Sequence, residues 1–160
     1  MRLKLVMMAL ALAACGSGVP GEVETMMTEQ RALTAEALNF DQKANASYAD
    51  GMGFLADAIR KNDAAQVKLT ATAMNDVRKA ALADELDAHA GVLRSLREMA
   101  QAQREREVGV DPEQANAAIH KSADDLRFAL NYIAKVELPG VDRAAFMDRL
   151  DQVIASSEAR

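Results

Sequence analysis

Residues 111–137, DPEQANAAIHKSADDLRFALNYIAKVE, carry the clearest structural pattern in this chain. Apolar side chains recur there in two rows with seven-residue spacing: Ile119, Leu126 and Ile133 in one row, and Ala123 and Leu130 in the other. Residues with this spacing lie on one face of an α-helix. Asp111 followed by Pro112 is typical of a helix start, because proline is tolerated at the first helical position. The segment therefore predicts an amphipathic helix with one buried face.

The same periodicity continues on both sides of this helix. It predicts helices over residues 23–61, 64–107, 112–137 and 143–157. Core candidates in the other three are Val23, Met26, Leu33, Ala37, Leu38, Phe40, Ala44, Tyr48, Met52, Leu55, Ile59, Leu82, Leu86, His89, Leu93, Leu96, Ala100, Phe146, Leu150, Val153 and Ile154. A capping box at Asp63-Ala-Ala-Gln66 leaves a tight turn, so the first two helices should form an antiparallel hairpin. We expect an all-α fold: an elongated antiparallel helical bundle of about four helices, forming one domain over residues 23–160.

Glycines inside the predicted helices leave two outcomes open. Gly51 and Gly53 each cost up to about 1 kcal/mol relative to alanine, so the first helix either continues through them or kinks or breaks there, and the sequence leaves both outcomes open. Gly91, inside the second helix, marks either a bend or a close helix crossing. If the long helices break, a compact four-helix bundle is the alternative to the elongated one.

Composition supports the helical prediction and excludes several classes of protein. The 160 residues include 33 alanines and no tryptophan, and β-branched and aromatic residues are few, which favours helix over strand. The formal charge of −5 argues against a nucleic-acid-binding protein, which would carry a basic face. A single cysteine excludes a disulfide framework or a thiolate metal cluster.

The first residues have the features of a secretory signal peptide. Arg2 and Lys4 supply a short positive region, and the apolar run LVMMALAL follows at residues 5–12. This run is far shorter than the roughly 20 residues that a membrane-spanning helix needs. We therefore expect residues 1–14 to be removed as a leader.

The end of the leader resembles the lipobox of bacterial lipoprotein precursors. The matching residues, the signal-peptidase recognition set, are Leu12, Ala13, Ala14 and Cys15. The resemblance implies cleavage before Cys15, acylation of its thiol and its new amine, and attachment to a membrane through these chains. Gly16 follows the cysteine where an inner-membrane retention signal would have aspartate, so the resemblance implies the outer membrane, facing the periplasm. Residues 15–22 then form a lipidated cysteine and a flexible Gly/Ser tether.

Two histidines are the strongest candidates for chemistry. Glu85 lies four residues before His89, and Asp124 lies four residues after His120, so each pair shares a helix face. A nitrogen and an oxygen placed in this way could bind a metal. The alternative is a histidine packed and hydrogen-bonded in the core, which the apolar row around His89 favours. No nucleophile, base and orienting group stand together in the sequence, so no catalytic residue is predicted.

Residues 59–84, IRKNDAAQVKLTATAMNDVRKAALAD, are similar to the first interhelical turn and second helix of the soluble periplasmic b-type cytochromes. Those proteins are four-helix bundles, so the resemblance implies the fold. Their haem is held by a methionine early in the first helix and a histidine in the last. Met52 lies near the first position, but residues 143–157 contain no histidine. The resemblance therefore does not extend to the cofactor, and no cofactor is predicted.

The sequence gives two interpretations of function. The first is a lipid-anchored periplasmic lipoprotein of the cell envelope, not an enzyme, that attaches to the membrane through acylated Cys15 and binds another envelope protein. The alternative is a metal- or haem-binding bundle that uses His89 and His120. No nucleic acid is expected as a partner, and the sequence does not identify a small-molecule ligand.

Overall fold

The computed structural model describes residues 19–40 and 47–158, and these form five helices. The helices are α2 (Gly21–Leu38), α3 (Tyr48–Ala71), α4 (Asp76–Glu107), α5 (Pro112–Tyr132) and α6 (Arg143–Glu158). The described residues contain no strand, which confirms the predicted all-α fold. Within the same residues, no helix has the length and apolar character needed to cross a bilayer. The predicted leader and Cys15 lie outside the described residues, and Gly21 and Glu22, predicted as tether, begin α2.

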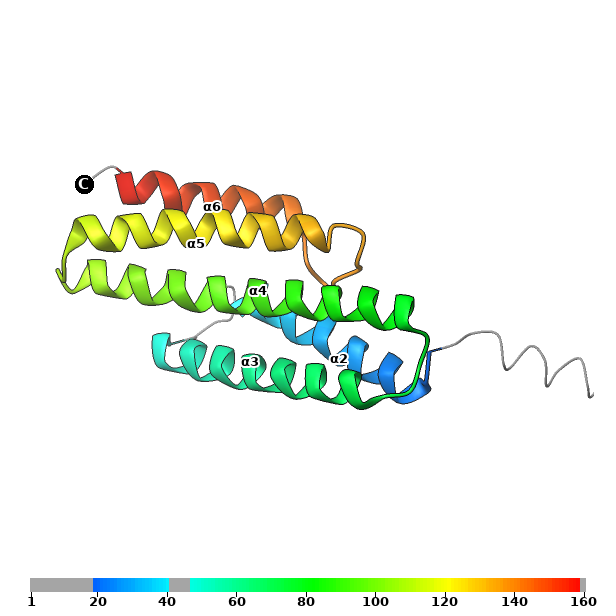
Figure 1. Ribbon diagram of the computed structural model, residues 1–160. Coiled ribbons are helices and arrows are strands. Elements are labelled where there is room, and N and C mark those ends of the chain that lie inside the picture. The colour runs from blue at the N-terminus through cyan, green and yellow to red at the C-terminus, as the bar shows by residue number, and fades with distance from the viewer. Residues whose placement is uncertain (1–18, 41–46, 159–160) are drawn as a thin grey trace, which may run out of the picture.

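Helix α4 is the centre of the fold. It is the longest described helix, and it packs against α2 and α3 on one side and against α5 on the other. Figure 1 shows α5 and α6 side by side along the opposite flank from α2 and α3, with all five helices running close to one long axis. Every described helix except α6 therefore has a substantial contact with α4.

The apolar core is divided into three clusters that meet on α4. Leu86 joins a cluster with Val23 and Leu69, and Leu93 joins a second with Leu55. The third cluster lies between α4, α5 and α6, with contributions from α2; its fully buried members include Val92, Ala123, Leu126 and Ile133. Burying one such aliphatic side chain contributes about 1.5–3 kcal/mol. Helix α4 thus buries one face against α2 and α3 and another face against α5.

The N-terminal half differs from the sequence prediction. The sequence predicts one helix over 23–61, with a break near Gly51 and Gly53 left open, but α2 ends at Leu38 and α3 begins at Tyr48, ahead of both glycines. The predicted turn at Asn62 and Asp63 is wrong, because α3 continues through both residues to Ala71. The break before α4 lies at residues 72–75 instead, so five helices are described where about four were expected.

The burial of apolar side chains explains why the helix does not end at the capping box of Asp63. A helix cap is worth about 1 kcal/mol. Continuing the helix past Asp63 buries Ala65 and Leu69, and the leucine alone outweighs the cap. The chain instead turns where Asn75 accepts hydrogen bonds from the backbone N–H groups of Val77 and Arg78.

The glycines inside the helices have different effects on the helices that contain them. Helix α3 runs through Gly51 and Gly53 without a break, so of the two outcomes left open at these glycines the continuous helix is the one observed. A side chain added at Gly51 would come 2.9 Å from the Phe40 ring, which shows a close approach between α3 and the end of α2. At Gly91 an added Cβ would lie 3.2 Å from the Cβ of Ala129. Gly91 thus marks a close crossing of α4 and α5, as one of the two interpretations proposed.

The C-terminal half follows the sequence closely. Helix α5 starts at Pro112 with Asp111 as its cap, and both of its predicted apolar rows are buried. It ends at Tyr132, five residues earlier than predicted, and α6 starts at Arg143 as predicted. The Arg143 guanidinium donates to the carbonyls of Leu130, Ile133 and Val136, which satisfies backbone acceptors left open where α5 ends.

The position of the turn between α3 and α4 can be tested by removing two cap side chains, one at a time. We expect Asn75→Ala to lower the free energy of unfolding by about 1 kcal/mol, because it removes the cap of α4. The control is Asp63→Ala, at the predicted but unused cap, where loss of the exposed ion pair with Arg94 should cost less than about 0.5 kcal/mol. Urea denaturation of both variants measures the difference. A larger loss of unfolding free energy for Asp63→Ala than for Asn75→Ala would contradict the observed turn.

Candidate functional site

Three polar residues occupy seam positions between α2, α3 and α4. Gln30 lies midway between Val23 and Ala37, Asn62 midway between Leu55 and Leu69, and His89 midway between Leu82 and Leu96, each at seven-residue spacing. All three are buried. We call this group, together with Arg31, Thr34 and Glu85, the polar layer.

His89 is held between α2 and its own helix. Its ring has zero exposure, and Nδ1 lies 2.8 Å from the Thr34 hydroxyl. Nε2 lies 3.5 Å from Oε1 of Glu85, longer than a directional hydrogen bond. Nε2 is buried without a hydrogen-bond partner among the described residues, so the contact between Nδ1 and the Thr34 hydroxyl holds the ring in place.

Arg31 and Glu85 connect the same two helices by a forked ion pair. Arg31 Nε and Nη2 donate to the two carboxylate oxygens of Glu85 at 2.7 and 3.2 Å. The Glu85 side chain is 14% exposed and that of Arg31 is 37% exposed. Burial alone would raise the pKa of the Glu85 carboxyl, but the neighbouring His89 ring and Arg31 guanidinium outweigh this effect and lower it from 4.5 to about 2. Glu85 is therefore a permanent anion at neutral pH.

Asn62 extends the polar layer to α3. Its side-chain amide donates to Oε1 of Gln30 and to the Leu86 carbonyl, each at 3.1 Å. Its own oxygen accepts from Gln66, which also donates to Asp87 on α4. Asn62 thus connects α2, α3 and α4.

Threonine, histidine and glutamate stand here in the order of a nucleophile, a base and an orienting group. The geometry alone would resemble a hydrolytic triad. However, Thr34 and His89 both have zero exposure, so no substrate atom can reach the Thr34 hydroxyl in this conformation. The chemistry that the arrangement can perform as it stands is structural: it fixes how α2, α3 and α4 lie against one another.

The structure keeps Glu85 beside His89, but it gives His120 and Asp124 other partners. His120 on α5 lies 3.3 Å from Ser157 and 3.6 Å from Glu158, both on α6. Asp124 pairs with Arg127 instead of His120. Across residues 19–40 and 47–158, no group of three or more His, Cys, Asp or Glu residues is placed to hold a metal ion. Metal or haem binding through His89 and His120 stays a prediction.

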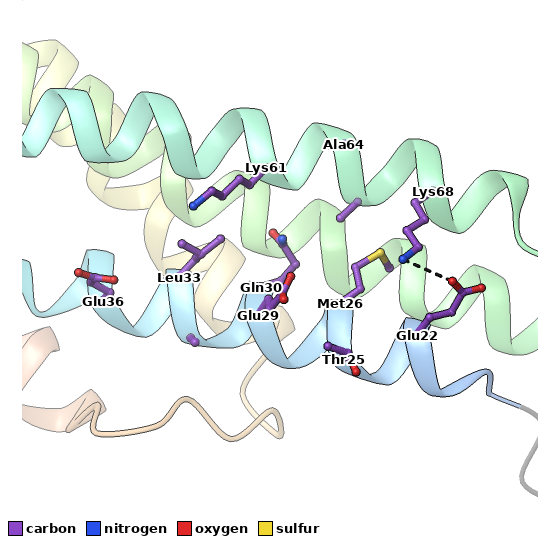
Figure 2. Close-up of a pocket in the computed structure, with 12 residues that line it drawn as sticks. Glu22, Thr25, Met26, Glu29, Gln30, Leu33, Glu36, Lys61, Ala64 and Lys68 are labelled. Atoms are coloured by element: carbon purple, nitrogen blue, oxygen red, sulfur yellow. Dashed lines mark ion pairs between the residues drawn. The ribbon is translucent and has the colours of Figure 1, made fainter.

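An open groove lies on the outer face between α2 and α3, with a volume of about 660 Å³. Figure 2 shows Lys68 extending from α3 toward Glu22 on α2, with Met26 and Leu33 between the two helices. Lys61 runs along the groove and pairs with Asp57 of its own helix at 3.1 Å. Glu22 pairs with Lys68 across the groove at 3.5 Å.

A second groove, of about 440 Å³, runs between α4 and α5 above the Gly91–Ala129 crossing. Its rim includes two aromatic rings one helical turn apart: Phe128 is 75% exposed and Tyr132 is 58% exposed. Four acidic residues line the groove, namely Asp84, Asp87, Glu98 and Asp125, together with the two basic residues Arg94 and Lys121, of which Lys121 pairs with Asp125. A hydrogen bond to Asp84 raises the pKa of the Tyr132 phenol above its usual value. This surface combines exposed apolar area with negative charge.

Sequence reasoning found His89 and Glu85 but missed their partners. Thr34 and Arg31 come from a helix more than fifty residues away in the chain, and no local spacing links them to α4. A signal for Gln30 and Asn62 did exist, because each interrupts an apolar row at a core position. The exposure of Phe128 also had a signal, since it lies off both apolar rows of α5.

No known protein family, curated protein or solved structure matches this chain. Function must therefore be argued from the chain itself.

The ion pair of Glu85 predicts a specific loss of stability in acid. Because the folded pKa lies below the unfolded one, the contribution of Glu85 is complete above pH 4.5 and is lost as pH falls toward 2. The shift corresponds to about 3 kcal/mol, which screening at the partly exposed Arg31 reduces to about 2 kcal/mol. Urea denaturation at pH 6 and pH 2.5 should show that Glu85→Gln removes about this much of the acid-induced loss. Glu98→Gln, an exposed residue on the same helix, is the control and should behave as wild type; equal acid sensitivity of both variants would contradict the assignment.

Proposed function

We propose that this chain is a lipid-anchored protein of the bacterial cell envelope, attached through Cys15 to the periplasmic face of the outer membrane. Its elongated antiparallel helical bundle binds another envelope protein and performs no catalysis. The exposed aromatic pair on α5 is the observation that carries the binding role. The lipobox residues Leu12 to Cys15 support the anchor.

The α4–α5 surface is suited to a protein partner. Exposed aromatic rings are concentrated at the energetically important points of protein interfaces, because they bury large areas at small entropic cost. This chain has six aromatic residues in all, and two of them lie on one exposed face of α5. The carboxylates around Phe128 and Tyr132 favour a partner segment that carries both apolar and basic side chains.

The polar layer supports a binding protein rather than an enzyme. A hydroxyl, an imidazole and a carboxylate meet at two places among the described residues. Thr34 and His89 are sealed inside the helices beside Glu85. Ser157, which lies next to His120 and Glu158, is also fully buried and donates its hydroxyl to the Ile154 carbonyl. A binding role requires only a stable framework and an exposed surface, and the polar layer and the α5 aromatic pair supply these two parts.

The lipid anchor can be tested at its acceptor atom. A Cys15→Ser precursor has no thiol to receive the diacylglycerol, so it should lose both the label from a metabolically supplied fatty acid and its attachment to membranes. Wild-type chain expressed in parallel is the positive control. Fatty-acid label retained on the serine variant would exclude Cys15 as the lipid site.

The binding surface can be tested by photo-cross-linking in cells. A cross-linking residue placed at the exposed Asp125 should capture a discrete partner, and the double variant Phe128→Ser, Tyr132→Ser should reduce that product about tenfold or more. The matched control is Val67→Ser on α3, which is 72% exposed and lies away from this surface. An undiminished product in the aromatic double variant would refute binding through α5.

A further inference from the structure

We infer that the groove between α2 and α3 binds a second copy of this chain. The groove is lined by glutamates on α2 and lysines on α3, among them Glu22, Glu29, Lys61 and Lys68. A surface with one acidic wall and one basic wall complements itself when two copies meet face to face. Such a contact is isologous, with the same residues on both sides of a two-fold axis.

The charges follow the helical repeat. Glu22 and Glu29 are seven residues apart on α2, and Lys61 and Lys68 are seven residues apart on α3. Glu22 and Lys68 lie level with each other, since their side chains meet at 3.5 Å. The helices run in opposite directions, so moving two turns along both brings Glu29 level with Lys61. The acidic and basic residues therefore form two matched levels along the groove.

The charges also select the orientation of the two copies. With the two-fold axis perpendicular to the helices, α2 would face α2 and the acidic walls would repel each other. With the axis parallel to the helices, α2 of one copy faces α3 of the other. Each level then becomes a ring of four alternating charges: at one level, Glu22 and Lys68 from each copy.

The spaces between the charged residues permit close packing. Thr25, Ala32 and Ala64 line the groove and are exposed, so only small side chains stand between the charged levels. Leu33 lies beneath them and is half-buried, so it provides apolar area for the partner helix, whereas Met26 beside it is buried in the core (Figure 2). The exposed charges remain at the rim of such an interface, where water can reach them.

The size of the face predicts a weak dimer. Helix α2 has 18 residues and is about 27 Å long, and two adjacent helices are about 20 Å wide. The contact would bury about 500 Å² per copy, or about 1,000 Å² in total, which is at the lower limit for a specific interface. The parallel axis brings both α2 N-termini to the same end. The charges select this orientation. Its consequence rests on the proposed lipid anchor: both copies can attach to one membrane, where their effective concentration is high.

Sedimentation equilibrium of the full chain in mild detergent tests the inference. We expect a reversible monomer–dimer equilibrium that weakens at high salt. In Lys61→Glu/Lys68→Glu both walls are acidic, and in Glu22→Lys/Glu29→Lys both are basic. Each variant alone should dimerise about 100-fold more weakly, because like charges now face each other. An equimolar mixture of the two should restore a heterodimer.

Three results would contradict the proposed dimer. They are a wild-type chain that stays monomeric at high concentration, a dimer that persists in both charge variants, and a mixture that fails to associate. Lys79→Glu/Lys135→Glu carries the same change of charge away from the groove and should dimerise as wild type. Circular dichroism checks that all variants remain helical. The anchor and the α5 surface are tested by fatty-acid labelling and cross-linking, so a monomer that still passes those tests would refute this inference alone.

Discussion

The hydrogen bonds of Asn62 fix the geometry on which the rest of this structure depends. Its amide reaches the Gln30 side chain and the Leu86 carbonyl at once, so it is satisfied only when α2, α3 and α4 stand at one particular height relative to one another. A buried polar group without a partner costs about 1–3 kcal/mol. A shift of α3 along its neighbours would leave Asn62 and Gln30 unpaired in the core.

Apolar packing could not supply this specificity alone. The seams of α2, α3 and α4 repeat every seven residues, and a shift of seven residues would again place apolar side chains opposite one another. The polar layer removes that ambiguity, because it occurs at a single level of the bundle. Thr34 with His89, and Arg31 with Glu85, add two further connections between α2 and α4 at the same level. The polar layer therefore specifies register, as buried polar residues do in coiled coils.

The C-terminal half could be predicted from sequence because its signals are local and agree. Pro112 and Asp111 start a helix exactly where the apolar rows of α5 begin, and no distant contact opposes them. The N-terminal half has conflicting signals. The capping box at Asp63 is a local preference, whereas the burial of Leu69 against α2 is a tertiary contact, and the tertiary contact is worth more.

The same distinction applies to the candidate site. His89 and Glu85 could be placed on one helix face from their spacing, but their partners on α2 depend on how the helices are brought together. The partners of His120 and Asp124 were also not predictable, because His120 lies beside Glu158 at the end of α6 and Asp124 pairs with Arg127. Spacing identifies which residues share a face; it does not identify what lies opposite that face.

The central place of α4 also determines how the chain assembles. As the chain is synthesised from its N-terminus, α2 and α3 emerge first, yet the carbonyl and imidazole that complete their polar contacts belong to α4. Helices α5 and α6 bury their apolar faces only after α4 is present as well. The N-terminal pair therefore cannot reach its final packing early, and the chain stays open to proteases and chaperones until its longest helix has been delivered.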